Sequence, residues 1–496
     1  MAETAPTYAA EPDEGATNPQ ARRIGFVLGL ALAIGLQLLP RPDGLSPEAW
    51  RVASIGLLMA VWWVSEALPL PVTALVPLVA LPLLAGFKPA DAAAQYADPV
   101  LYLFLGGFLI AIAIERWGLS ARLAYSIVAA AGPRPRLIVA GFMIATAFIS
   151  MWISNTATSM MMTPLALGVA GAATLSASGG RGAEDPRFAF ALILGVCHAA
   201  TIGGVGTPIG SPTNLIATSW LAEQKGVEVA FLDWMAVGMP VLVTLLMASW
   251  FMLTRGLTTD RAAGTAAQAQ VRTQLAGLGP MRAAEIRVAL IFVTVACLWV
   301  GQQWLARLPG LSGLSDMVIA MIGGLALFVL PAGRGYDRAL LTWQDAAKVP
   351  WGIILLFGGG LALADAATAT GLAAFLGGGL AGASSLQLIV LVLGVVAVMI
   401  FITEFASNVA SITMMLPILG ALVLATGQPA ASFVVPAAIA ASTGFMMPVG
   451  TAANAIAYGT GRVPAGRMMR IGLILNLIAA AVLTAVGLTV APAVLG

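Results

Sequence analysis

The sequence SNTATSMMMTP at residues 154–164 recurs as SNVASITMMLP at residues 407–417, which lies 253 residues further along the chain. The same offset places Ser150 on Thr403. Each copy interrupts a long apolar stretch with a Ser-Asn pair and continues into a helix-forming, methionine-rich run. Self-similarity of this kind indicates that the chain contains two copies of one structural unit.

A second pair of matching segments follows the first. PIGSPTNLIA at residues 208–217 matches PVGTAANAIA at residues 448–457, now at an offset of 240. The shorter offset is explained by a longer polar loop in the first copy, near residues 176–187. An odd number of membrane spans between the copies would give them opposite orientations. Inverted repeats with interrupted helices are typical of secondary transporters, with the substrate bound between the repeats near the middle of the membrane.

The composition requires a lipid environment. Hydrophobic residues make up 59% of the 496 residues and charged residues only 9%, and the mean hydropathy is +0.94. Apolar runs of about 20 residues, the length that crosses a bilayer, recur along the chain. We therefore predict an all-α polytopic membrane protein with about 11 transmembrane helices and two re-entrant hairpins, near residues 137–174 and 386–425. The net charge of +2 gives no basis for binding nucleic acid.

The basic residues predict an orientation, because positively charged loops remain in the cytoplasm. Alternate threading from a cytoplasmic N-terminus leaves 5 of the 24 Lys and Arg residues outside and 19 inside. The first 21 residues are polar and lack the apolar core of a signal peptide, so we expect a disordered cytoplasmic tail. These features predict a bacterial inner-membrane location. The five external residues are Arg41, Arg51, Lys88, Lys225 and Arg307.

The repeated motifs have the chemistry to hold an anion and a cation together. Ser and Asn are good N-caps, and the helix after each pair directs free N–H groups and a partial positive charge toward an anion. The helix before each pair ends in free carbonyl oxygens, which suit a small cation. The Gly-Ser-Pro sequence at residues 210–212 and the Gly-Thr-Ala sequence at residues 450–452 are expected to break their own helices, because glycine permits sharp turns and close approach.

No fixed cation accompanies these motifs. Lys and Arg are absent between Lys348 and Arg462, and also from residues 137–180 and 188–222. A carboxylate removed from water without a partner is destabilised by several kcal/mol or more. Bound Na⁺ is the natural mobile counter-charge, and this predicts coupled transport.

Other classes of protein are less well supported. An intramembrane enzyme would need a nucleophile–base pair or a metal cluster, and the single histidine, His198, reads better as a packed core residue. A channel would need a continuous polar pore. Glu404 lies beside Thr403 in the sequence, and we expect its side chain to point away from the face of Ser407, so we interpret it as a structural hydrogen-bonding residue.

With these residues in view, the sequence resembles the divalent anion/sodium symporter (DASS) family from about Ile24 to the C-terminus. The resemblance depends on the paired motifs SNT and SNV, the GSPTN and GTAAN elements, WWVSEALPLPVTALVP at residues 62–77 and FLGGF at residues 104–108. It implies a homodimer in which a transport domain moves against a scaffold domain as an elevator. The domains would be a tail (1–21), first scaffold helices (22–130), first transport elements (131–255), a cytoplasmic linker (256–284), second scaffold helices (285–385) and second transport elements (386–496).

The resemblance also implies the binding residues. One sodium site would use Ser150, Ser154, Asn155 and Gly210, and the other Thr403, Ala406, Ser407, Asn408 and Gly450. The substrate carboxylates would contact Ser154, Asn155 and Thr156 on one side and Ser407, Asn408 and Thr451 on the other.

This chain departs from the family pattern on its second wall. Val409 stands where the second motif usually has threonine, and alanines occupy positions 452 and 453 where prolines are common. The expected function is sodium-coupled symport of C4-dicarboxylates such as succinate, fumarate or malate. The alternatives are a sodium-independent dicarboxylate exchanger and a sulfate or citrate carrier of the same fold.

Overall fold

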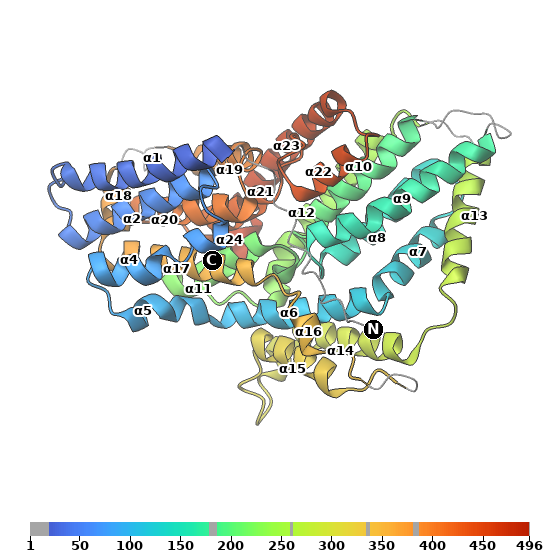
Figure 1. Cartoon of the computed structure of the whole chain (residues 1–496), viewed down its shortest axis with the longest axis horizontal. Helices are drawn as coiled ribbons and strands as arrows, with labels where there is room; N and C mark the ends of the chain where they lie inside the picture. Colours follow the sequence, from blue (N-terminus) through green and yellow to red (C-terminus); the bar gives the residue numbers. More distant parts are fainter. Residues whose placement is uncertain (1–18, 178–185, 258–260, 334–337, 380–385, 496) are drawn as a thin grey trace, which may run out of the picture.

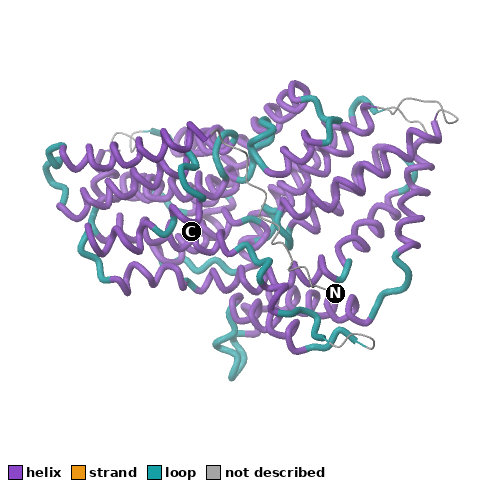
Figure 2. Tube along the Cα trace, in the orientation of Figure 1, coloured by secondary structure: helices purple, strands orange, loops and turns teal. Residues whose placement is uncertain are grey.

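The computed structural model describes residues 19–177, 186–257, 261–333, 338–379 and 386–495. Within these ranges the chain is helical, and the single β-bridge, between Pro331 and Ala339, forms no strand (Figures 1 and 2). The first half contains α1 (Pro19–Leu38), α2 (Pro47–Val64), α3 (Leu70–Thr73), α4 (Val76–Leu84), α5 (Pro89–Ala94), η1 (Gln95–Ala97), α6 (Pro99–Arg116), α7 (Leu119–Ala131), α8 (Pro135–Ser150), α9 (Asn155–Ala177), α10 (Pro186–Gly203), η2 (Pro208–Gly210), α11 (Pro212–Lys225) and α12 (Phe231–Thr254).

The second half follows the connecting helix α13 (Arg261–Gly277). Its elements are α14 (Ala283–Leu305), α15 (Asp316–Val329), α16 (Trp343–Ala346), α17 (Trp351–Ala369), α18 (Leu372–Gly379), α19 (Leu388–Thr403), α20 (Asn408–Thr426), α21 (Ala431–Ala441), α22 (Ala452–Gly459), α23 (Ala465–Leu488) and α24 (Val490–Leu495).

The repeat predicted from the sequence is present in the helices. α8 ends at Ser150 and α19 ends at Thr403, which are 253 residues apart. The next helices begin at Asn155 and Asn408, again 253 residues apart. α8–α9 and α19–α20 therefore form the two predicted hairpins, each broken at its Ser-Asn pair.

The predicted breaks near Gly210 and Gly450 are also present. α10 ends at Gly203 and α11 begins at Pro212, while α21 ends at Ala441 and α22 begins at Ala452. The interval without α-helix is longer than the Gly-Ser-Pro and Gly-Thr-Ala triplets alone, and in the first copy it contains the short 3-10 helix η2.

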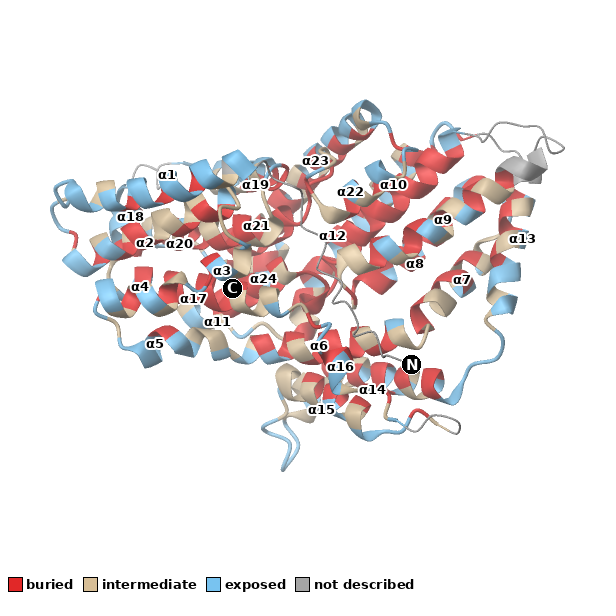
Figure 3. Cartoon of the chain, in the orientation of Figure 1, coloured by how far each residue is buried: buried red, intermediate tan, exposed pale blue. Residues whose placement is uncertain are grey.

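The first halves of these broken helices are enclosed by other helices. Every residue of α10 from 188 to 203 is buried, as is every residue of α21 (Figure 3). α10 packs against α8, α9, α12 and α22, and α21 packs against α11, α19, α20 and α23. The loop after α10 is buried from Gly204 to Ser211, whereas the loop after α21 is buried as far as Phe445 and exposes Val449. In the buried parts each polar backbone group needs a partner.

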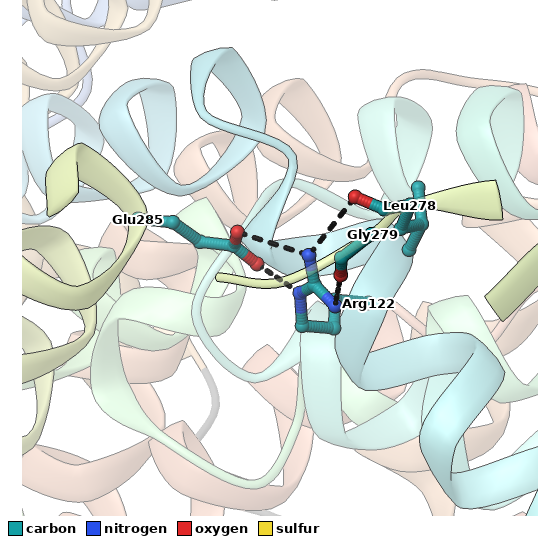
Figure 4. A network of polar contacts seen from close by, with 4 residues as sticks. All are labelled: Arg122, Leu278, Gly279 and Glu285. Carbon is teal, nitrogen blue, oxygen red and sulfur yellow. Dashed lines mark hydrogen bonds and ion pairs between the residues drawn. The ribbon is translucent and has the colours of Figure 1, made fainter. Parts of the chain in front are cut away.

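The segment predicted as a cytoplasmic linker is mostly a packed helix. α13 contacts α7, α8 and α9, and the Gln268 side-chain amide donates to the Ala129 carbonyl oxygen at 3.0 Å. Arg122 of α7 fixes the end of this segment (Figure 4). Its guanidinium donates to the carbonyl oxygens of Leu278 and Gly279 at 3.4 and 2.9 Å and pairs with the buried carboxylate of Glu285.

The length and apolar composition of the helices agree with a membrane location. Seven helices in the described residues are long and apolar enough to cross a bilayer, and shorter apolar helices accompany them. The predicted total of about 11 spans, with their orientation, stays a prediction. At the N-terminus, α1 begins at Pro19, so the helix includes the last three residues that were assigned to the tail. The remainder of that tail lies outside the described residues.

Candidate functional site

Three oxygen atoms lie close together at the break of the first hairpin. The Ser150 hydroxyl, at the end of α8, lies 2.8 Å from Asn155 Oδ1 and 2.6 Å from the carbonyl oxygen of Ala200 on α10. A hydroxyl has one proton, so it cannot satisfy both acceptors fully. Three buried or half-buried oxygens that share one proton have spare lone pairs, and this is the arrangement that a small cation satisfies.

The second hairpin repeats this geometry. The Thr403 hydroxyl donates toward Asn408 Oδ1 at 2.8 Å and toward the carbonyl oxygen of Ala441, the last residue of α21. Ser150 and Thr403 are both completely buried. The two hairpins therefore contain equivalent hydroxyl–amide–carbonyl clusters.

Equivalent asparagines form hydrogen bonds to the backbone of the loops that follow α10 and α21. Asn214 donates its side-chain amide to the carbonyl oxygens of Gly204 and Thr207 at 2.8 and 2.9 Å. Asn454, which is 240 residues further on, donates to the carbonyl oxygens of Gly444 and Met447, each at 3.0 Å. Each asparagine side chain donates the hydrogen bonds that the loop carbonyl oxygens lose where the helix ends. The loop backbone can therefore pass close to the hairpin.

Gly204 and Gly210 bring this loop against the first cluster. A methyl group on Gly204 would lie 2.4 Å from Asn155 Oδ1 and 2.9 Å from the Gly210 carbonyl oxygen. Such distances are shorter than any normal contact, so the absence of a side chain permits the approach. The structure therefore brings Ser150, Asn155 and Gly210 together, whereas Ser154 of the same predicted set makes none of these contacts.

The second loop lies against Thr403 and Glu404. A methyl group on Gly444 would meet the Thr403 backbone oxygen at 3.4 Å and the Gly450 oxygen at 3.6 Å. A methyl group on Gly450 would lie 2.8 Å from Glu404 Oε2. Thr403, Asn408 and Gly450 thus lie close together, with the Glu404 carboxylate beside them, whereas Ala406 and Ser407 of the same predicted set make none of these contacts.

Glu404 holds the second loop through its side chain. Its two carboxylate oxygens accept from the backbone N–H groups of Met446 and Met447 at 2.9 and 2.7 Å, and Asn476 of α23 donates to it at 2.6 Å. These bonds agree with the structural role predicted for Glu404. His198 is fully buried, with Nδ1 3.0 Å from the Ser249 hydroxyl and its ring edge-on to Phe445, as expected of a packed residue.

The two repeats meet at this site. The Ser442 hydroxyl at the end of α21 lies 2.8 Å from that of Ser211 and 2.6 Å from that of Thr213, at the start of α11. α9 packs against α22 of the other repeat, and α20 packs against α11. Each hairpin is therefore in contact with the broken helix of the other copy.

The remaining predicted residues lie at the helix starts. Ser154 Oγ accepts from the Ala157 N–H at 3.3 Å, so it acts as an N-cap, whereas the Ser407 side chain makes no capping bond. Thr451 Oγ1 accepts from the Asn454 N–H at 3.1 Å and caps α22. The following predicted residues are half-buried and so partly open to a ligand: Ser154, Asn155, Thr156, Ala406, Ser407, Asn408, Val409 and Thr451.

The sequence analysis did not predict the part that three further residues play in the loops of the site. Asn214 and Asn454 lie within the matched segments and could have been found by their equivalent positions. Thr207, which donates to the Met151 carbonyl oxygen and accepts from the Gly210 N–H, is replaced by Met447 at the equivalent position of the second copy and so gave no such signal.

These features define a class, namely helical membrane transporters built from two repeats with broken hairpins. The chain belongs to the family described as the sodium:sulfate symporter transmembrane region, whose model matches residues 20–495. This confirms the resemblance to divalent anion/sodium symporters. The chain is accordingly a multi-pass membrane protein of a transporter family.

Relatives and solved structures agree with this assignment. The chain is 37% identical over 477 residues to the sodium-dependent dicarboxylate transporter SdcS of Staphylococcus saprophyticus subsp. saprophyticus, covering 95% of this chain and 92% of the relative. The SdcS protein of Staphylococcus aureus strain USA300 gives the same identity and coverage.

Two solved transporters share the fold alone. The YdaH transporter of Alcanivorax borkumensis has a TM-score of 0.56 at 16% identity, covering 95% of this chain and 97% of that one. MtrF of Neisseria gonorrhoeae has a TM-score of 0.57 at 12% identity, covering 96% and 95%.

Proposed function

We propose that this protein is a secondary transporter that imports C4-dicarboxylates together with Na⁺. The family and the names of the SdcS relatives support this proposal. The observation that carries it is the pair of hydroxyl–amide–carbonyl clusters at Ser150–Asn155 and Thr403–Asn408. Each cluster has more acceptor lone pairs than protons, so each is suited to one sodium ion.

The substrate binds between the starts of α9 and α20 in this proposal. The first N–H groups of a helix lack intrahelical partners and attract an anion. Side-chain hydroxyls and amides of the two Ser-Asn motifs complete the site. Thr156 on the first wall offers a hydroxyl, whereas Val409 on the second offers only methyl groups, so the two carboxylates of the substrate have different surroundings.

Sodium coupling follows from the charges. A dicarboxylate has two negative charges, and no Lys or Arg lies in the segments that form the site. Helix ends contribute partial charges only. The substrate is therefore bound well only after sodium ions have filled the two clusters, and empty clusters leave acceptor oxygens facing one another.

The movement is assigned to the transport elements at residues 131–255 and 386–496. In the proposed elevator mechanism these elements carry the site across the membrane past scaffold helices at residues 22–130 and 285–385. The proposal includes a homodimer in a bacterial inner membrane, with the N-terminus in the cytoplasm. The positive-inside distribution of Lys and Arg supports this orientation.

Uptake by purified protein in proteoliposomes tests the proposal. Labelled succinate should accumulate with an inward Na⁺ gradient and not with a K⁺ gradient. If internal dicarboxylate drives accumulation without Na⁺, the protein is an exchanger and not a symporter. Competition by unlabelled sulfate or citrate stronger than that by fumarate or malate would change the assigned substrate.

Two variants connect this activity to the site. Asn155→Ala and Asn408→Ala should each abolish uptake and remove the thermal stabilisation of the protein by Na⁺, while the sodium-free unfolding temperature changes little. Gln37→Ala, which removes an exposed amide on α1, is the matched control. Sodium-dependent uptake that persists in either asparagine variant would show that the motif is not part of the mechanism.

A further inference from the structure

Three hydroxyl groups, of Ser211, Thr213 and Ser442, form a closed hydroxyl cluster where the two repeats meet. Ser211 Oγ and Thr213 Oγ1 lie 3.0 Å apart, and Ser442 Oγ lies 2.8 Å from the first and 2.6 Å from the second. All three side chains are buried. Each hydroxyl has one proton to donate and can also accept. Three protons therefore suffice for the three contacts, and the cluster is satisfied in the interior of the protein.

Ser211 takes part in this cluster in place of its ordinary local role. It precedes the first residue of α11, where a serine hydroxyl usually accepts from the free N–H groups of the helix. Among the described residues its side chain makes no such capping bond. The equivalent residue of the second repeat, Thr451, does cap its helix through the Asn454 N–H at 3.1 Å. The Ser211 hydroxyl is therefore directed to the other repeat.

The sequence has no second copy of the hydroxyl cluster. The offset of 240 that relates the two broken helices places Ile202 opposite Ser442 and Ala453 opposite Thr213. Both Ile202 and Ala453 are buried, and neither has a hydroxyl. The internal repeat by itself therefore does not account for the cluster, which joins the two copies once and asymmetrically.

The hydroxyl cluster connects the backbone of one proposed sodium site to that of the other. Ser211 directly follows Gly210, which belongs to the first site. Ser442 directly follows Ala441, whose carbonyl oxygen accepts from the Thr403 hydroxyl in the second site. A displacement of either loop therefore reaches the other through one hydrogen-bonded contact, and hydrogen-bond networks of this kind can carry energetic coupling between sites.

We propose that the hydroxyl cluster couples the two sodium sites, so that an ion in one site raises the affinity of the other. This inference rests on the proposed sodium-coupled function. A bound cation orders the loop that supplies its backbone oxygen, and the cluster extends this order to the loop of the other repeat. The second ion then binds with a smaller loss of conformational entropy. The three hydroxyl residues act through the neighbouring backbone, so they are positioning residues.

Sodium titrations of the full-length protein in detergent test the coupling without substrate. The measured quantity is the rise in unfolding temperature as NaCl replaces choline chloride at constant ionic strength. Wild-type protein should respond with a Hill coefficient between about 1.5 and 2, because the coefficient cannot exceed the number of coupled sites. Thr213→Val keeps the shape of the side chain and removes its hydroxyl, and it should lower the coefficient to about 1. Ser442→Ala should have the same effect.

Two control variants separate coupling from a structural defect. Thr213→Ser keeps a hydroxyl in the cluster and should retain the wild-type coefficient. Thr218→Val on the same helix removes a hydroxyl that donates to the Leu215 carbonyl oxygen at 3.0 Å, and it should also retain the coefficient. A purely structural defect lowers the unfolding temperature without sodium and leaves the steepness of the sodium response unchanged.

The outcomes distinguish this inference from the proposed function. A wild-type coefficient of about 1 would overturn the coupling and leave two independent sodium sites. An unchanged coefficient in Thr213→Val and Ser442→Ala would also overturn it, as would a lowered coefficient in either control variant. Wild-type protein that Na⁺ does not stabilise at all would contradict the proposed sodium sites and, with them, this inference.

Discussion

Gly204 and Gly444 occupy equivalent positions in the two repeats, yet the structure predicts that alanine lowers the affinity for Na⁺ at Gly204 and leaves it unchanged at Gly444. A methyl group on Gly204 would lie 2.4 Å from Asn155 Oδ1, 2.9 Å from the Gly210 oxygen and 3.0 Å from Asn155 Nδ2. On Gly444 the three nearest atoms lie at 3.4, 3.4 and 3.6 Å, which are ordinary contacts. Gly204→Ala must therefore displace the Asn155 amide or the Gly210 backbone, whereas Gly444→Ala displaces nothing.

The size of the effect follows from overpacking, which is typically unfavourable by about 1–3 kcal/mol. If the displaced groups bind sodium, the affinity for Na⁺ should fall by about five- to 150-fold in Gly204→Ala. In Gly444→Ala it should stay within about twofold of the wild-type value.

The assay is the concentration of Na⁺ that gives half-maximal succinate uptake, measured beside the rise in unfolding temperature that Na⁺ produces. The unfolding temperature without sodium separates a local effect from misfolding. Equal sodium affinity in the two variants would refute the assignment of Gly204, Asn155 and Gly210 to one cation site.

Three further predictions concern single side chains. Ser150→Ala removes the shared hydroxyl of the first cluster and should lower the apparent sodium affinity about tenfold; Thr146→Val, which loses only a bond within the same helix, should leave it unchanged, and equal affinities would contradict the cluster. Glu404→Gln removes the negative charge and places a side-chain NH₂ group opposite backbone N–H donors, so both the unfolding temperature and the sodium affinity should fall. If uptake keeps the wild-type dependence on sodium, Glu404 has no electrostatic role in transport. Val409→Thr adds a hydroxyl to the second wall and should change the order in which dicarboxylates, sulfate and citrate compete for uptake; an unchanged order would show that this position does not face the substrate.

The hairpins could be predicted from the sequence because their determinants are local. A Ser-Asn pair ends one helix and caps the next, and the repeat supplied an independent copy of the same pattern. The predicted ranges 137–174 and 386–425 therefore agree with α8–α9 and α19–α20 to within a few residues. The convergence of Ser150 with Asn155, and of Thr403 with Asn408, also follows from short separations along the chain.

Other features depend on distant contacts and could not be predicted in this way. The hydroxyl cluster of Ser211, Thr213 and Ser442 joins residues about 230 positions apart. α13 is too polar to be recognised as part of the core, and its position is set by packing on α7 and α9.

The two halves hold their loops by different chemistry. In the first half, Thr207 of the loop donates to the backbone oxygen of Met151. In the second half, the residue equivalent to Met151 is Glu404, and its side chain accepts from the N–H groups of Met446 and Met447. The direction of donation is the same, from loop to hairpin, but the acceptor has changed from a carbonyl to a carboxylate.

This difference makes the two proposed sodium sites unequal. The carboxylate of Glu404 lies beside Gly450, so an acidic group is adjacent to the second proposed site, although its oxygens also accept from Met446, Met447 and Asn476. The first site is built from neutral oxygens only, at Ser150, Asn155 and the nearby backbone. In the proposed mechanism we therefore expect a cation to be attracted more strongly to the second site than to the first. We therefore expect the second proposed site to fill first, because its hairpin contains the acid and the first hairpin has a methionine, Met151, at the equivalent position.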